Sequence, residues 1–193
     1  MNANVFLAAA LLGRGRVGWA SSETTLGLPF DVPPRYAPLD EDHYPLPTSA
    51  YALSKVVSET TAEHVSAWSG IPFAALRFSN IIAPDDYAWL DADRADPAAR
   101  RWNLWGYVDV DDVAAACRHA IEAPLHGAES FIVAAADTMM DRPSRALLEE
   151  VFPGVPVTRE LGEFETLLSI ERARERLGWE PRRSWRGRLP PHG

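Results

Sequence analysis

The chain of 193 residues is poor in cysteine and in lysine, with one of each, Cys117 and Lys55. A single cysteine excludes a disulfide within the chain and fits a reducing cytoplasm, where we expect the protein to be located. It also excludes a zinc site built from several cysteines, and the five histidines lack the spacing of metal ligands. We therefore expect no metal site.

The sequence also lacks a long basic run and a long hydrophobic run. Its formal net charge of −8 argues against nucleic acid or an anionic membrane as a partner. An apolar run at residues 5–12 is too short to span a bilayer, and Arg14 and Arg16 follow it, whereas a secretory signal has its basic residues first. We predict a buried helix over 4–12 that stops at Gly13, with a signal-peptide core as the alternative.

Apolar runs alternate with helical segments along the rest of the chain. The patterns predict strands at 17–20, 73–79, 107–110, 131–136 and near 156–159. They predict helices at 49–68, from Asp111 or Asp112 to Ala123, at 143–152 and at 170–177. Proline-rich residues 27–49 and acidic residues 84–103 are predicted to be an irregular connection and a loop or lid. This alternation is typical of a mostly parallel α/β sheet.

The single lysine follows a tyrosine by four residues, in Tyr51-Ala-Leu-Ser-Lys55. Residues four apart lie on the same face of a helix. A free phenol has a pKa of about 10 and is a poor base at neutral pH, but a nearby ammonium favours its ionised form. Such a pair can exchange a proton with an alcohol that is being oxidised. The alternative is an exposed tyrosine and lysine spaced this way by chance, and the pair alone does not decide between the two.

A hydroxyl from another element would complete such a site by orienting the substrate oxygen. Ser22 stands at the carboxyl end of the strand predicted at 17–20. That end of a strand is where an open α/β sheet places groups that face a ligand. We therefore take Ser22 as the candidate for this role.

Four motifs occur in a fixed order along the chain: Ser22-Glu-Thr-Thr-Leu-Gly27, Tyr51-x-x-x-Lys55, Leu76-Arg-Phe-Ser-Asn80 and Tyr107-Val-Asp-Val-Asp-Asp112. A closing stretch, Ala173-Arg-x-x-Leu-Gly-Trp-x-Pro181, follows them. The ordered set resembles the extended short-chain dehydrogenase/reductase family, in its NAD-dependent epimerase/dehydratase group, from about residue 4 to residue 185. The resemblance implies an α/β fold, the carboxy-terminal portion of a Rossmann-like doubly wound parallel sheet plus a small α/β substrate-binding region.

The resemblance also implies roles for individual residues. Tyr51 matches the family's catalytic acid/base, and Lys55 matches the residue that binds the nicotinamide ribose and tunes the tyrosine. Ser22 matches the hydroxyl that orients the substrate. Ser79 falls where the family's backbone passes the nicotinamide end of the cofactor, and Asn80 falls where an asparagine commonly touches the substrate.

The activity that the resemblance implies is NAD(P)-dependent oxidoreduction or epimerisation of a sugar or nucleotide-sugar-like alcohol, by hydride transfer with the tyrosine as acid/base. The expected cofactor is NAD or NADP, and the expected partner is a small-molecule substrate. A homodimer through helix 49–68 is a further expectation. A hypothesis of another class is a non-catalytic remnant or a regulatory binding protein of the same fold.

The family's opening strand and Gly-x-x-Gly-x-x-Gly turn, which hold the pyrophosphate, have no counterpart in the sequence, since Gly13-Arg-Gly15 precedes a strand. We expect residues 1–83 to form a partial NAD(P)-binding region. We expect residues 84–193 to hold the substrate loop and lid, the last sheet strand near 130–136 and a small carboxy-terminal substrate subdomain. The adenosine-binding part is expected to be missing, through a misplaced start or a truncated gene, which would leave the chain inactive alone and strand 17–20 with an unpaired edge.

Two acidic positions depart from the family's patterns. Sugar 4,6-dehydratases of the family place Asp-Glu directly after the catalytic hydroxyl residue, whereas this chain has Glu23 and Thr24, which argues against dehydration. Glu23 is a candidate substrate-binding residue or accessory acid, although a carboxylate at the rim of the loop is the plainer interpretation. Asp109 stands where relatives usually carry histidine, and the sequence offers no explanation for it.

The segment before the last motif is rich in arginine and aromatic residues. Arg100 and Arg101 have the planar geometry that suits a diphosphate, and Arg101 is our candidate substrate-binding residue there. A solvated pair is the plainer interpretation of both. Trp102, Trp105 and Tyr107 are candidates for stacking against a sugar or nucleoside, although packing is the commoner role of such residues.

Overall fold

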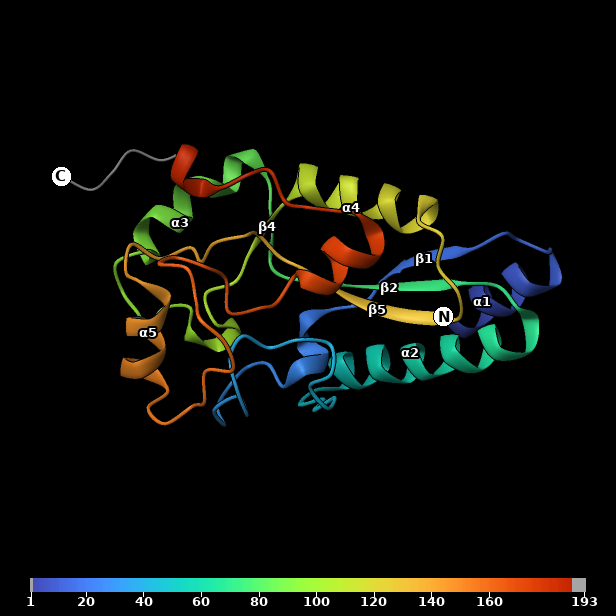
Figure 1. The fold of residues 1–193 in the computed structure, drawn as a ribbon, viewed down its shortest axis with the longest axis horizontal. Helices are drawn as coiled ribbons and strands as arrows, with labels where there is room; N and C mark the ends of the chain where they lie inside the picture. The colour runs from blue at the N-terminus through green and yellow to red at the C-terminus, as the bar shows by residue number, and fades with distance from the viewer. Residues whose placement is uncertain (1, 189–193) are drawn as a thin grey trace.

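The computed structural model describes residues 2–188. Its centre is a three-stranded parallel sheet in the order β1-β2-β5, built from β1 (Val17–Ala20), β2 (Phe73–Phe78) and β5 (Ala128–Val133) (Figure 1). Val17 lies opposite Phe73, which in turn lies opposite Ala128. The parallel α/β sheet predicted from the sequence is confirmed.

Helices cover both faces of this sheet (Figure 1). On one face, Phe6 of α1 (Asn2–Leu11) packs edge-on against Trp19 and Phe73, with ring centroids 5.3 and 5.1 Å apart. Helix α2 (Ala50–Ser69) lies beside α1 on that face. On the other face, α4 (Val110–Glu122) comes so close that a Cβ at Gly18 would lie 3.3 Å from the side chain of Ile121. The sheet is therefore the middle of three layers.

Helix α2 carries the tyrosine and lysine, and its two ends are fixed by local chemistry. The Ser49 hydroxyl accepts a hydrogen bond from the backbone N–H of Ala52. Gly70 ends the helix in the left-handed region, at φ 74°. Serine before the first turn and glycine after the last are the residues that favour these conformations. The helix predicted over 49–68 is confirmed to within about one residue.

A second region extends from the carboxyl ends of the strands. It contains a short parallel pair, β3 (Ile81–Ile82) with β4 (Val108–Asp109), and the helices α3 (Tyr87–Asp93) and α5 (Ser144–Val151). Short 3-10 turns span 23–26, 84–86, 101–103 and 185–187, and a π turn spans 173–177. Trp105 and Trp179 are buried in the core that joins this region to the sheet. None of the helices within residues 2–188 is long and apolar enough to cross a membrane.

Several predicted elements differ from the observed ones. β5 begins at Ala128, three residues earlier than predicted, because its first half contains the partly exposed polar residues Glu129 and Ser130 and does not read as an apolar run. The strand predicted near 156–159 is a single bridge between Ala37 and Val157. The segment 84–103, predicted as a loop, contains α3. These errors lie where tertiary contacts, rather than a local pattern, fix the backbone.

Asp109 has a structural role that the sequence did not reveal. Its carboxylate accepts a hydrogen bond of 2.8 Å from the backbone N–H of Asp111 and caps α4, so the prediction of Asp111 or Asp112 as the cap was wrong. The same buried carboxylate accepts a hydrogen bond from the Tyr87 hydroxyl at 2.7 Å and pairs with Arg188 at 3.0 Å. Asp109 therefore joins α3, α4 and the carboxy-terminal segment.

Candidate active site

A pocket of about 400 Å³ opens where β1 and β2 end. The carboxyl ends of parallel strands meet at one edge of a sheet, and ligands of open α/β sheets bind there. The pocket is lined by residues at the ends of the two strands and just after them, by residues of α2, and by Trp102 from the second region. The predicted site residues among them are Ser22, Glu23, Tyr51, Lys55, Ser79 and Asn80. The fold thus brings all the predicted site residues to one pocket, except Arg101.

Tyr51 and Lys55 lie on one face of α2, as their spacing predicts. The Lys55 ammonium is 5.3 Å from the centroid of the Tyr51 ring. It donates a hydrogen bond of 2.7 Å to the carbonyl of Ala20, the last residue of β1. An ammonium has three donors, so two remain for a ligand. The Tyr51 side chain is 55% exposed and borders the pocket.

Ser22 is held by the turn that follows β1. It caps the 3-10 turn Glu23–Leu26, and its oxygen accepts hydrogen bonds from the backbone N–H and the hydroxyl of Thr24, at 3.2 and 3.0 Å. Both contacts use the oxygen as an acceptor. Within residues 2–188 the Ser22 hydroxyl donates to no other group, so its proton remains available for a substrate oxygen.

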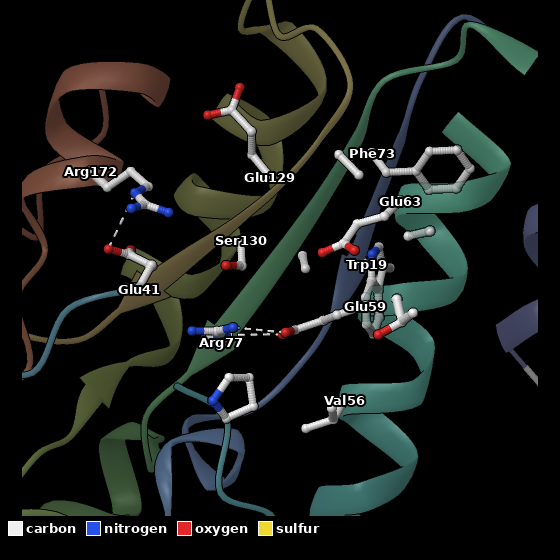
Figure 2. Close-up of a pocket in the computed structure, with 15 residues that line it drawn as sticks. Trp19, Glu41, Val56, Glu59, Glu63, Phe73, Arg77, Glu129, Ser130 and Arg172 are labelled. Carbon is white, nitrogen blue, oxygen red and sulfur yellow. Dashed lines mark hydrogen bonds and ion pairs between the residues drawn. The ribbon is translucent and has the colours of Figure 1, made fainter. Parts of the chain in front are cut away.

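A buried ion pair fixes α2 against the sheet beside this site. Figure 2 shows Arg77 of β2 and Glu59 of α2 pointing toward each other in a second pocket, which lies on the α2 face of the sheet. The guanidinium donates twice to the carboxylate, at 3.0 and 2.8 Å. The hydroxyl of Ser21, next to Ser22, donates to the same carboxylate at 2.6 Å. This network sets the helix face that carries Tyr51 relative to Ser22.

The sequence analysis missed this anchor. A signal for it was present, because Arg77 is a charged residue within an otherwise apolar strand. A charge in a buried strand requires a partner of opposite sign. The partner, Glu59, follows Lys55 by one helical turn.

Glu23 is buried and not at the rim of the loop, so the plainer interpretation of this residue was wrong. It is 4% exposed, and it accepts a hydrogen bond of 3.3 Å from the Asn103 side chain. Burial raises the pKa of Glu23 to about 7, against smaller opposing effects of Ser79, Asn103 and Arg100. A carboxyl that titrates close to neutrality within a pocket is a candidate for a functional role.

The two arginines of the second region differ in their surroundings. Arg100 is buried between the rings of Trp89 and Trp102, with its guanidinium carbon 5.0 and 5.2 Å from their centroids. The interpretation of a solvated pair was therefore wrong for Arg100. Arg101 is exposed and does not line the pocket. The structure thus places Arg101 apart from the other predicted site residues.

Of the aromatic residues in the same segment, only Trp102 borders the pocket. Trp105 and Tyr107 are completely buried in the core, which is the packing role that such residues more often have. Residues 2–188 contain no group of three or more histidine, cysteine, aspartate or glutamate side chains placed to hold a metal ion.

The sequence matches the model of the NAD dependent epimerase/dehydratase family over residues 1–134. The chain belongs to this family. No curated protein sequence matches this family member.

Solved structures of sugar-nucleotide epimerases share the fold of this family member. UDP-glucose 4-epimerase from Thermotoga maritima, determined with UDP-glucose, is 20% identical, with a TM-score of 0.65 over 95% of this chain and 63% of that chain. UDP-glucuronic acid 4-epimerase from Bacillus cereus, in complex with NAD, is 17% identical, with a TM-score of 0.66 over 95% of this chain and 62% of that chain. The likeness shows the Rossmann-like fold, and this chain spans less than two thirds of the length of either epimerase.

Proposed function

We propose that this member of the epimerase/dehydratase family carries the acid/base site of an NAD(P)-dependent oxidoreductase or epimerase that acts on a sugar or nucleotide-sugar-like alcohol. The observation that carries the proposal is the meeting of Ser22, Tyr51 and Lys55 at one pocket, at the carboxyl ends of β1 and β2. Membership of the family supports the reaction class. The UDP-glucose bound to the structurally similar epimerase from Thermotoga maritima supports the substrate class.

The groups at the pocket fit the nicotinamide ribose end of NAD(P). Two donors of the Lys55 ammonium are left for ribose hydroxyls once the third is bonded to Ala20. The phenol of Tyr51 borders the same space. The family's Gly-rich turn for the pyrophosphate is not in the sequence, so the fit concerns the nicotinamide end alone. When bound, the cofactor supplies the hydride acceptor.

The chain's own residues would then handle the proton and the position of the substrate. Tyr51 takes the proton of the carbinol oxygen as the alcohol is oxidised, and returns it when the alcohol is re-formed. The Lys55 ammonium, 5.3 Å from the ring, stabilises the negative charge on the phenol oxygen during the transfer. Ser22 donates its free proton to the same substrate oxygen and so fixes the orientation of the carbinol.

The substitution Tyr51→Phe tests this assignment, with Tyr44→Phe as the matched control. Removing a general acid/base costs about 10²–10⁴-fold in turnover, so we expect a loss of this size in Tyr51→Phe. Tyr44 is 66% exposed and borders none of the described pockets, so its substitution should leave turnover unchanged. The measurement is the interconversion of UDP-glucose or UDP-glucuronic acid and their epimers, followed by NMR with NAD or NADP added.

Measurable turnover in the wild type that is equal in Tyr51→Phe would contradict the role of Tyr51. A folded wild-type chain that converts none of these sugars with either cofactor would contradict the enzymatic proposal for this chain and favour the non-catalytic alternative.

A further inference from the structure

Glu23 lies where two parts of the pocket wall are in contact, and we call this contact the joint. One part is the turn 23–26, which holds Ser22, and the other is residues 100–106, which we call the wall segment because it carries Trp102. The side-chain amide of Asn103 donates to the Glu23 carboxyl at 3.3 Å and to the carbonyl of Gly106 at 2.8 Å. Asn103 therefore links Glu23 to the backbone of the wall segment.

The wall segment is packed tightly at this joint. A Cβ on Gly106 would lie 2.9 Å from the Ser79 hydroxyl and 3.2 Å from the Asn103 carbonyl, so no larger residue fits without movement. Asn103 itself is fully buried. Any loosening of the joint would therefore move the wall segment, and Trp102 with it.

The polar groups of the joint are incompletely paired. One carboxyl oxygen of Glu23, the side-chain oxygen of Asn103, and the Nε and Nη2 atoms of Arg100 are buried without hydrogen-bond partners. Buried polar groups without partners cost free energy, so the protonation state of Glu23 strongly affects the stability of this joint. A neutral carboxyl has an O–H donor that a carboxylate lacks, and the unpaired oxygen of Asn103 is an acceptor at the same joint.

We propose that Glu23 is a positioning residue: its uncharged carboxyl holds the wall segment, and with it Trp102, against the Ser22 side of the pocket, and its ionisation loosens that contact. This inference rests on the proposed function only in treating the pocket as the place where the substrate binds. It gives Glu23 no part in proton transfer to the substrate.

The direction of the pH effect follows from burial. Burial raises the pKa of Glu23 from 4.5 to about 7 in the arrangement that the structure shows, with the wall segment against the Ser22 side of the pocket, which we call the closed arrangement. The closed arrangement therefore binds the proton more tightly than a solvated carboxyl does, and this stabilisation is lost as the pH rises through about 7. Arg100, on the wall segment, is the charged group that faces Glu23 and opposes the shift, and Asp93 of α3 acts in turn on Arg100. Ser79 and Asn103 complete the surroundings and are uncharged.

Fluorine NMR of the protein labelled with 5-fluorotryptophan tests the proposal, with Trp102→Phe used to assign the resonance. We expect the Trp102 resonance to move with a midpoint near pH 7, and the protection of the amides of residues 100–106, relative to their intrinsic exchange rates at each pH, to fall above that pH. In Glu23→Gln the resonance should stay at its low-pH position throughout, because the amide is uncharged and close to the acid in shape.

Glu41→Gln is the matched control. Burial also raises the pKa of Glu41, but its carboxylate accepts a hydrogen bond from the backbone N–H of Ile132 on β5, and it does not line the pocket at the strand ends. The Trp102 midpoint should therefore persist in this variant. A midpoint that persists in Glu23→Gln, or a wild-type resonance without a midpoint, would overturn the proposal.

If Glu23→Gln does not fold, the wild-type titration and amide exchange decide the question. None of these measurements requires turnover. A chain without catalytic activity would therefore count against the proposed function and not against this role of Glu23.

Discussion

Single residues set the geometry of this site mainly through contacts that are remote in sequence. The Arg77–Glu59 pair joins a strand to the helix that carries Tyr51, and both side chains are at most 10% exposed. Neither charged group is well exposed to water, so each depends on the other to compensate its buried charge. Of the contacts between single residues, the Arg77–Glu59 pair is therefore the one whose loss we expect to lower the stability most.

We expect Glu59→Ala to lower the free energy of unfolding by about 3 kcal/mol, because it leaves the Arg77 guanidinium buried without its partner. Urea denaturation measures this change. Glu122→Ala is the control, since its pair with Arg118 has side chains 57% and 75% exposed and should contribute little to the free energy of unfolding. Equal losses in the two variants would show that the buried pair is no more important than an exposed one.

The sequence predicted those site residues whose positions depend on local structure. The spacing of Tyr51 and Lys55 places them on one helix face, and the end of a strand places Ser22 at the pocket. Burial of Glu23 was not predictable in this way, because the residue that covers and bonds to it, Asn103, lies 80 positions later. The same holds for Arg100, which is enclosed by Trp89 and Trp102 only in the folded chain.

Among the elements, β1 has an unusual position. It is the terminal strand of the sheet, and within residues 2–188 no strand pairs with its outer edge. The backbone N–H of Val17 donates to the carbonyl of Pro72, just before β2, and that of Ser21 donates to Leu76 of β2. The N–H groups of Gly18 and Ala20 therefore point to the open side. The Ala20 carbonyl on that side is bonded by Lys55.

Amide hydrogen exchange should follow this alternation. We expect protection at Val17 and Ser21 and fast exchange at Gly18 and Ala20, because the latter two have no partner strand. NMR resolves the four amides individually. Protection of all four would contradict an open edge and would indicate that another strand, such as one from a second copy, pairs with β1 in solution.

Elements with strong local signals were predicted well, and those fixed by tertiary contacts were not. α2 has a serine cap and a terminal glycine, and β2 is an apolar run in which Arg77 is the one charged residue, so both were placed closely. α3 lies in an acidic segment without clear periodicity and was missed. The cap of α4 was misplaced because the carboxylates at 109, 111 and 112 are equivalent by type, and only the folded backbone selects Asp109.

At the scale of the whole molecule, the chain has the Rossmann-like fold of the NAD dependent epimerase/dehydratase family and spans about 63% of the length of a structurally similar epimerase. The order of its motifs predicted the family, and the alternation of apolar runs with helical segments predicted the parallel sheet. Its three-layer arrangement brings the end of β1, the end of β2 and one face of α2 to a single pocket. The central claim is that this pocket binds the nicotinamide end of the cofactor beside Tyr51.

The most direct test of this claim is an NMR titration with nicotinamide mononucleotide, which carries the ribose that Lys55 would hold and lacks the adenosine half of the cofactor. We predict saturable shifts at residues 20–24, Tyr51, Lys55 and Ser79, their loss in Lys55→Met, and no such shifts with adenosine monophosphate. Shifts that are absent from these residues at saturation, or that are unchanged in Lys55→Met, would contradict the account.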